Sequence, residues 1–202
     1  MDRFFYLIPY LSTFVGLHCL SNAWVAILLY HVGMLAVLIN RSFAWRSLWQ
    51  GWRNREGVFL VMLGASSGII ILVFSGPLLG DTSIVAGRLN LLGLTGISWQ
   101  AFSIYYCVAN PILEEAFWRG FLGTSCSTVD RSDLFFAGYH ILAVIFFVSL
   151  LISALSVLTL VLVAWIWRRQ SLRHGGLAVP LVSHFAADLS IIVAASQFRV
   201  EM

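Results

Sequence analysis

The sequence contains no lysine and few charged residues of either sign. Its twelve basic residues are all arginine and nine residues are acidic. Charged residues make up only 10% of the 202, against about 25% in a typical soluble domain. A chain that is 60% hydrophobic cannot cover a water-exposed surface with polar groups. This composition excludes an ordinary soluble globular protein, and we expect no nucleic-acid partner because no basic patch is present.

Cysteine patterns, metal motifs and linkers are also missing. The three cysteines, Cys19, Cys107 and Cys126, are widely spaced and form no CxxC pair, so no disulfide framework or zinc ribbon is predicted. No HExxH motif occurs, and we expect neither a metal nor another cofactor. No Pro/Ser/Gly-rich linker or repeat divides the chain, which indicates a single membrane-embedded domain over residues 1–202.

Long apolar runs are what the sequence has in abundance. A membrane-spanning helix needs about 20 mostly apolar residues. The candidate spans are Phe4–Leu20, Ala23–Ile39, Val58–Leu79, Trp99–Leu122, Leu134–Trp167 and Leu177–Phe198. No small-x-small cleavage site follows the first, so we expect it to stay as a helix rather than act as a signal peptide.

Two segments between the spans have a different character. Arg41–Gly57 is basic and rich in tryptophan, which predicts an amphipathic helix lying in the membrane interface. Asp81–Ser98 predicts a loop with a short apolar or re-entrant stretch.

The run Leu134–Trp167 is too long for one crossing. A helix over it would span about 50 Å, against a hydrocarbon core of about 30 Å. A hairpin near Ser149–Ser156 places most arginines on the cytoplasmic side, as the positive-inside rule requires. These are Arg3, Arg41, Arg46, Arg53, Arg55, Arg131, Arg168, Arg169 and Arg173, and only Arg88 and Arg199 fall outside. We therefore predict an all-α polytopic transmembrane helical bundle of about seven crossings, within a range of about six to eight, with a cytoplasmic N-terminus.

Three acidic residues, Glu114, Glu115 and Asp188, lie inside apolar runs, and His140 and His184 lie in the same kind of segment. A charged side chain at membrane depth costs at least about 2.5 kcal/mol, so such residues are functional candidates by default. His18 and His31, in the first two spans, have no acidic partners and are interpreted as structural. Counted from the predicted cytoplasmic ends, Glu114, His140 and His184 each lie roughly 10 Å deep. Three helices thus bring polar groups to one level.

Spacing along the helices divides these residues into pairs. Glu115 and Arg119 are four residues apart and share a helix face, so they are predicted to pair, either as a purely structural ion pair or as a support of the site. Glu114 is rotated by about 100° from Glu115 and can point elsewhere. Phe136 and His140, and His184 and Asp188, repeat the four-residue spacing.

Three motifs on separate predicted helices carry a resemblance. They are EExxxR at Glu114–Arg119, FxxxH at Phe136–His140 and HxxxN/D at His184–Asp188. In this order they resemble the CPBP family of CAAX prenyl proteases and bacteriocin-processing enzymes, which are glutamic-type intramembrane proteases. Residues 1–98 carry no motif, and we expect the helices of residues 99–198 to form the catalytic core.

The resemblance implies a membrane peptidase that cleaves a peptide bond near the cytoplasmic face without a covalent intermediate. Its implied catalytic residues are Glu114 and His140, which activate a water, and His184 and Asp188, which line the oxyanion site. Glu115, Arg119 and Phe136 would support that geometry. The family often has Asn in place of Asp188, and a carboxylate donates a hydrogen bond only when protonated. Asp188 is therefore expected either to line the oxyanion site or to orient His184.

The same residues permit other functions. Glu114, His140, His184 and Asp188 could ligate a divalent ion in a metal-dependent hydrolase. Intramembrane Glu and His also carry protons in transporters, and an inactive relative would keep the motifs without activity. Gly64–Gly68 reads GxSxG, but inside an apolar helix it predicts close helix packing rather than a nucleophile.

The expected partners are the lipid bilayer and a peptide or protein substrate. Within the resemblance, prenylated C-termini, bacteriocin leaders and C-terminal sorting signals stay open as substrates, so membrane-anchored or lipidated peptides are included. The small size and the arginine-only basicity indicate an integral protein of the bacterial inner membrane.

Overall fold

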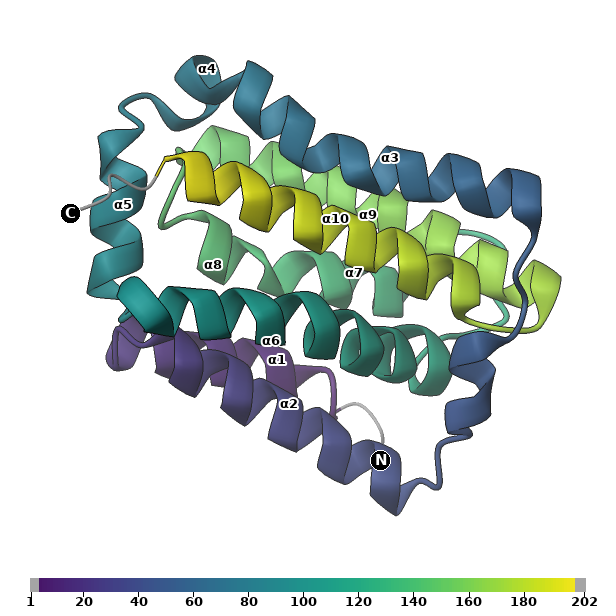
Figure 1. Ribbon diagram of the computed structural model, residues 1–202. Coiled ribbons are helices and arrows are strands. Elements are labelled where there is room, and N and C mark those ends of the chain that lie inside the picture. The colour runs from purple at the N-terminus through teal and green to yellow at the C-terminus, as the bar shows by residue number, and fades with distance from the viewer. Residues whose placement is uncertain (1–3, 199–202) are drawn as a thin grey trace.

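The structure, a computed structural model, describes residues 4–198 as a bundle of helices with no strand among those residues (Figure 1). The first half contains α1 (Leu7–Thr13), η2 (Phe14–Cys19), α2 (Ala23–Asn40), η3 (Trp45–Trp49), α3 (Asn54–Val73), α4 (Ser75–Leu79) and α5 (Ser83–Leu91). The second half contains α6 (Gly96–Glu114), η4 (Glu115–Phe121), α7 (Arg131–Tyr139), α8 (Ile141–Val144), α9 (Leu150–His174) and α10 (Ala178–Gln197). Arg3 and Arg199, which enter the predicted topology, lie outside the described residues.

Four helices are long and apolar enough to cross a membrane. They are Ala23–Asn40, Arg55–Val73, Leu150–His174 and Ala178–Gln197, and the bent pair formed by α5 and α6 with η4 makes a fifth if it is one span. Large apolar side chains such as Phe59 and Leu151 are exposed on their outer faces, as lipid contact requires. The expected all-α membrane bundle is confirmed at this level, while the count of seven crossings stays a prediction.

The long run Leu134–Trp167 is broken, as its length predicts. After α7 and α8 the helix stops, and α9 starts at Leu150 and returns alongside α7 (Figure 1). Ser149 begins α9 because its side chain accepts a hydrogen bond from the Ile152 amide at 3.4 Å. The turn therefore precedes the expected window of Ser149–Ser156, most of which lies inside α9.

The predicted interfacial helix over Arg41–Gly57 is wrong. The segment contains only the five-residue 3₁₀-helix η3, and α3 begins at Asn54. Two of its backbone carbonyls bond to the start of α10 instead of continuing a helix. The Ser47 carbonyl accepts from the Leu177 amide and the Gln50 carbonyl from the Ala178 amide, each at 2.9 Å. These bonds satisfy the start of α10, which cannot supply its own acceptors there.

The segment Asp81–Ser98 holds a short helix where a loop with an apolar stretch was expected. Helix α5 is bent by 88° from the α6–η4 helix that follows it. Gly93, in the connection, has φ +78°, a conformation that glycine adopts without strain.

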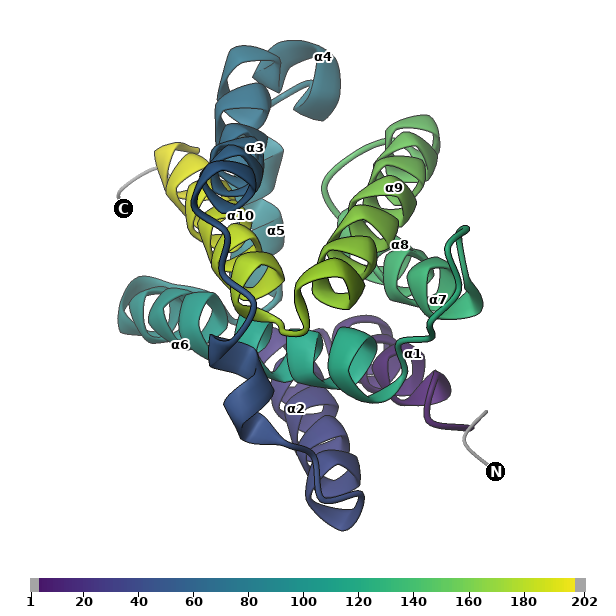
Figure 2. The ribbon, with the colours of Figure 1, turned by 90° about the vertical axis from the view of Figure 1, so that its right-hand side faces the viewer.

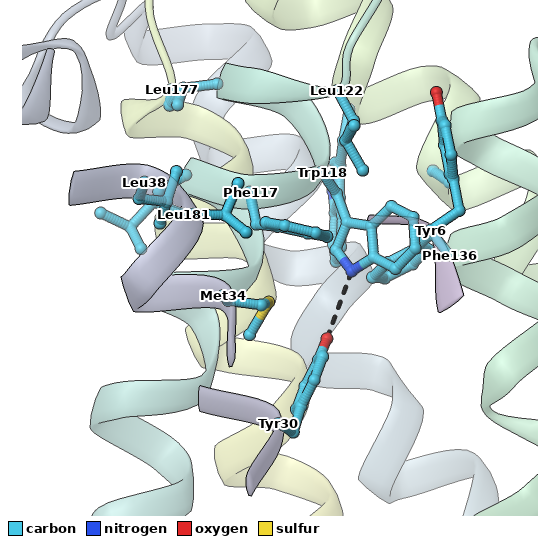
Figure 3. Close-up of a cluster of buried hydrophobic side chains, with 14 of the residues drawn as sticks. Tyr6, Tyr30, Met34, Leu38, Phe117, Trp118, Leu122, Phe136, Leu177 and Leu181 are labelled. Carbon is cyan, nitrogen blue, oxygen red and sulfur yellow. Dashed lines mark hydrogen bonds between the residues drawn. The ribbon is translucent and has the colours of Figure 1, made fainter. Parts of the chain in front are cut away.

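Two helix pairs organise the motif-bearing half of the bundle. Viewed along the bundle, α10 lies between α3 and α6, and α9 packs on α7 (Figure 2). Gly64 and Gly68 of α3 touch the backbone of α10 at Ser183 and Ser190. The helix-packing interpretation of the GxSxG sequence is therefore confirmed. Between the pairs, Phe117, Trp118 and Phe136 form the centre of a buried aromatic core (Figure 3).

Candidate active site

The first motif lies where α6 changes into a π-helix. Glu114 is the last residue of α6 and Glu115 the first of η4, in which the Leu122 amide bonds to the Phe117 carbonyl five residues earlier at 2.9 Å. Such wide turns occur often at functional sites. Both glutamates are fully buried. Pro111 lies one turn earlier, inside α6, and the helix continues through it.

Glu115 has two basic partners on one carboxylate oxygen. Its Oε1 lies 3.2 Å from Nη1 of Arg119 and 2.8 Å from Nδ1 of His184. The Arg119 guanidinium also lies 3.8 Å from the centre of the Phe136 ring, a cation–π distance. The predicted pairing of Glu115 with Arg119 is confirmed, and it extends to α10 through His184.

Glu114 points to different neighbours, as its rotation from Glu115 predicts. Its Oε1 accepts hydrogen bonds from the hydroxyls of Tyr30 and Tyr139. Its Oε2 lies 3.4 Å from Nε2 of His184. The two adjacent glutamates therefore share His184, one at each ring nitrogen.

His140 joins the cluster through its neighbour in the chain. Its Nδ1 lies 2.8 Å from the Phe136 carbonyl, and its Nε2 lies 3.3 Å from the Tyr139 hydroxyl, which also bonds to Glu114. The Phe136 ring packs edge-on against the His140 ring at 4.9 Å. The four-residue spacing of this motif thus orients the imidazole.

Asp188 completes the cluster from one turn further along α10. Its Oδ1 lies 3.6 Å from Nε2 of His184, and its Oδ2 accepts from the Asn110 amide at 3.0 Å. The Asn110 side-chain oxygen in turn bonds to His31 at 3.3 Å, and His31 bonds to the Tyr105 hydroxyl at 2.8 Å. His31 is therefore linked to Asp188 through the single residue Asn110.

All seven residues singled out by sequence therefore lie in one connected cluster. Six come from α6, η4, α7 and α10, and His140 lies between α7 and α8. Sequence reasoning missed Tyr30, Tyr139 and Asn110. Signals for two of them exist, because Tyr139 directly precedes His140 and Asn110 is a polar residue four positions before Glu114 in an apolar helix. Tyr30 has no such signal.

Among the residues that the structure describes, no three His, Cys, Asp or Glu side chains are arranged to hold a metal ion. What the cluster offers is a chain of hydrogen-bonded acids and imidazoles, buried except at the partly exposed His140. Such an arrangement can move protons and orient a nucleophile.

Comparisons with known proteins give one match. No curated protein and no solved structure matches the chain. Residues 96–190, just under half of the sequence, match the model of a protein family. The matched range includes all three motifs and ends two residues after Asp188. That family is the Rce1-like family of type II CAAX prenyl endopeptidases, and the match confirms the resemblance drawn from the motifs.

Proposed function

We propose that this protein is a glutamic-type intramembrane endopeptidase that hydrolyses a peptide bond near the cytoplasmic face of the membrane. The family match supports a membrane-embedded endopeptidase of the CAAX type in general. The finer proposal rests on one observation. Glu114 contacts His184 directly, and His140 through Tyr139, in a cluster that is buried except at the partly exposed His140.

Glu114 is the general base of the proposed reaction. Its Oε1 accepts from two phenols, whereas its buried Oε2 accepts no hydrogen bond in the described part of the chain and has only the 3.4 Å contact with Nε2 of His184. Oε2 can therefore take a proton from an attacking water. His140 accepts or returns a proton through Nε2, because its Nδ1 bonds to the Phe136 carbonyl. Water attacks the peptide carbonyl, and no covalent intermediate with the chain forms.

His184 stabilises the developing oxyanion in this proposal. Glu115 holds its Nδ1, and Nε2 faces Glu114 and Asp188. A fixed donor directed at an oxyanion contributes about 3–4 kcal/mol to catalysis. Asp188 orients His184 rather than donating itself, because its Oδ2 already accepts from Asn110 and its Oδ1 faces the imidazole.

An apolar hollow beside the cluster suits the substrate. It lies between η3, α6 and α10 and is lined by Trp49, Val108, Pro111, Ile112, Leu181, Val182 and Phe185. Several of these residues neighbour Glu114 or His184 in sequence. The lining favours apolar side chains or a lipid group of a membrane-anchored peptide.

The proposal is tested with the purified protein in lipid vesicles. Peptides of three classes are offered, namely prenylated C-terminal peptides, leader peptides and C-terminal sorting peptides, and products are measured by mass spectrometry. We expect cleavage of at least one class, and a fall of about 10²- to 10⁴-fold for Glu114→Gln, the usual contribution of a general base.

The matched control is Glu56→Gln. Glu56 is exposed at the start of α3 and bonds to Gln170 and His174, outside the cluster. This variant should cleave as the wild type does. Undiminished cleavage by a folded Glu114→Gln variant would refute the proposal. Loss of wild-type activity with a chelator, restored by a divalent metal, would favour the metal-dependent hydrolase instead.

A further inference from the structure

The oxygen Oε1 of Glu114 is held by two phenols from different parts of the chain. Tyr30 reaches it from α2 and Tyr139 from α7. Both tyrosines are buried, and their rings lie 5.4 Å apart. Tyr30 lies outside residues 96–190, the range that matches the family.

The direction of the Tyr30 hydrogen bond is fixed by a third residue. The indole N–H of Trp118 can only donate, and it lies 3.2 Å from the Tyr30 hydroxyl (Figure 3). The Tyr30 oxygen therefore accepts from Trp118, and its one proton is directed at Glu114. The buried core around Trp118 holds this donor in place.

Tyr139 stands between the two groups that the proposed reaction needs. Its hydroxyl bonds to Glu114 and lies 3.3 Å from Nε2 of His140. A carbonyl can only accept, so Nδ1 of His140 carries the hydrogen that bonds to Phe136. In the neutral imidazole Nε2 is then an acceptor, and because the one Tyr139 proton is donated to Glu114, the Tyr139–Nε2 contact carries a hydrogen only when Nε2 is protonated.

We infer that Tyr30 and Tyr139 are positioning residues of the site, which hold Glu114 by Oε1 so that Oε2 alone faces the reacting water and His184. This inference rests on the proposed function. It assigns Tyr30 of α2 to the site, so the N-terminal half of the chain contributes a functional side chain as well as packing.

The phenols act by fixing the carboxylate. Without them Glu114 can turn about its last torsion, and either oxygen can then face His184. A misplacement of about 1 Å at a reacting group can cost about 10²-fold in rate. We therefore expect removal of either hydroxyl to lower kcat by about 10- to 100-fold, with KM changed by no more than about twofold.

The test compares Tyr30→Phe, Tyr139→Phe and Tyr10→Phe in vesicles, with kcat, KM and the melting temperature measured for each. Tyr10 is the matched control, because its hydroxyl donates to the Phe135 carbonyl at 3.1 Å, outside the cluster. We expect kcat to fall in the first two variants and to stay at the wild-type value in the third.

A second measurement covers the case in which a Phe variant fails to fold. Incorporation of 3-fluorotyrosine at position 30 or 139 keeps the ring and the hydroxyl but makes the phenol a stronger donor. The stronger hydrogen bond withdraws more negative charge from the Glu114 carboxylate and makes it a weaker base. We therefore expect kcat to fall by about threefold, since the rate of general-base catalysis follows the strength of the base. The same change at position 10 should have no effect.

Two results would overturn different statements. If Glu114→Gln is inactive while the Tyr30 and Tyr139 variants, with Phe or fluorotyrosine, keep the wild-type kcat, the inference about the tyrosines is wrong and the proposed function stands. If Glu114→Gln cleaves as the wild type does, the proposed function itself is wrong.

Discussion

Glu115 and Arg119 carry charge in a place where unpaired charge is costly. Their side chains are 0% and 2% exposed, and the Arg119 guanidinium has Glu115 as its ion-pair partner. Glu115 also holds Nδ1 of His184. The pair therefore neutralises a buried cation and sets the orientation of an imidazole with the same carboxylate oxygen.

The substitution Glu115→Gln removes that carboxylate and leaves the arginine buried without its partner. Breaking one side of a buried ion pair costs about 3–5 kcal/mol. We expect the free energy of unfolding, measured by denaturant titration in detergent micelles, to fall by about this amount. The double variant Glu115→Gln/Arg119→Met removes both charges and should recover part of the loss. An unchanged free energy of unfolding in the single variant would show that the ion pair does not stabilise the fold.

At this scale the sequence predicts the contacts that are local. The pairs of Glu115 with Arg119 and of His184 with Asp188 follow from a spacing of four residues, which places side chains on one helix face. The contact of Tyr30 with Glu114 joins residues 84 positions apart. A tyrosine in an apolar helix is indistinguishable by sequence from one that packs in the core, so only the fold reveals it.

The position of α10 decides where His184 and Asp188 lie, and α3 sets that position. At Gly64 and Gly68 an added Cβ would lie 2.3 Å and 2.0 Å from the carbonyl oxygens of Ser183 and Ser190. Ser183 also donates to the Leu60 carbonyl at 2.8 Å and accepts from the Trp167 indole at 3.1 Å. Helices packed this closely cannot separate without moving the site.

We expect Gly68→Ala to push α10 away from α3 and to reduce cleavage strongly, because the new methyl group would meet backbone atoms rather than a flexible side chain. Overpacking of this kind costs about 1–3 kcal/mol, seen as a lower melting temperature. The matched control is Gly87→Ala in α5, where an added Cβ meets nothing within 4 Å. Equal activity and melting temperature of the two variants would contradict the role of this contact.

Element boundaries could be predicted where the bilayer sets them. The expected spans Ala23–Ile39 and Leu177–Phe198 agree within one residue with α2 and α10, since a helix of about 20 apolar residues is what a membrane requires. The segment after α2 was predicted wrongly, because its carbonyls bond to α10 instead of continuing a helix. The π-helix η4 could not be predicted, because no residue pattern in Glu115–Phe121 distinguishes it from a continuation of α6.

At the scale of the whole molecule, the end of α9 and the starts of α3 and α10 lie at one end of the bundle (Figure 1), and the sequence near these ends carries Arg53, Arg55, Arg168, Arg169 and Arg173. Contacts between distant segments hold that end together. Glu56 at the start of α3 bonds to His174 at the end of α9, and Arg168 of α9 bonds to the carbonyls of Thr124, Cys126 and Thr128 before α7. The number of crossings stays a prediction, because four helices, or five with the bent pair, are long and apolar enough to span a membrane. Which side of the membrane this end faces stays a prediction, namely the cytoplasm.

Two native cysteines test that orientation. Cys19 ends η2 and Cys126 lies in the loop before α7, at opposite ends of the bundle, and both are exposed, whereas Cys107 is buried. A hydrogen bond with Thr128 lowers the pKa of the Cys126 thiol, so more of it is the reactive thiolate at neutral pH. With a membrane-impermeant thiol reagent we expect intact spheroplasts of a bacterial expression host to be labelled at Cys19 alone and opened membranes at both positions. Cys19→Ala and Cys126→Ala identify each label by mass spectrometry. Labelling of Cys126 in intact spheroplasts would show that the topology is the opposite of the predicted one. The arginine-rich end, and the proposed cleavage site near it, would then face the outside.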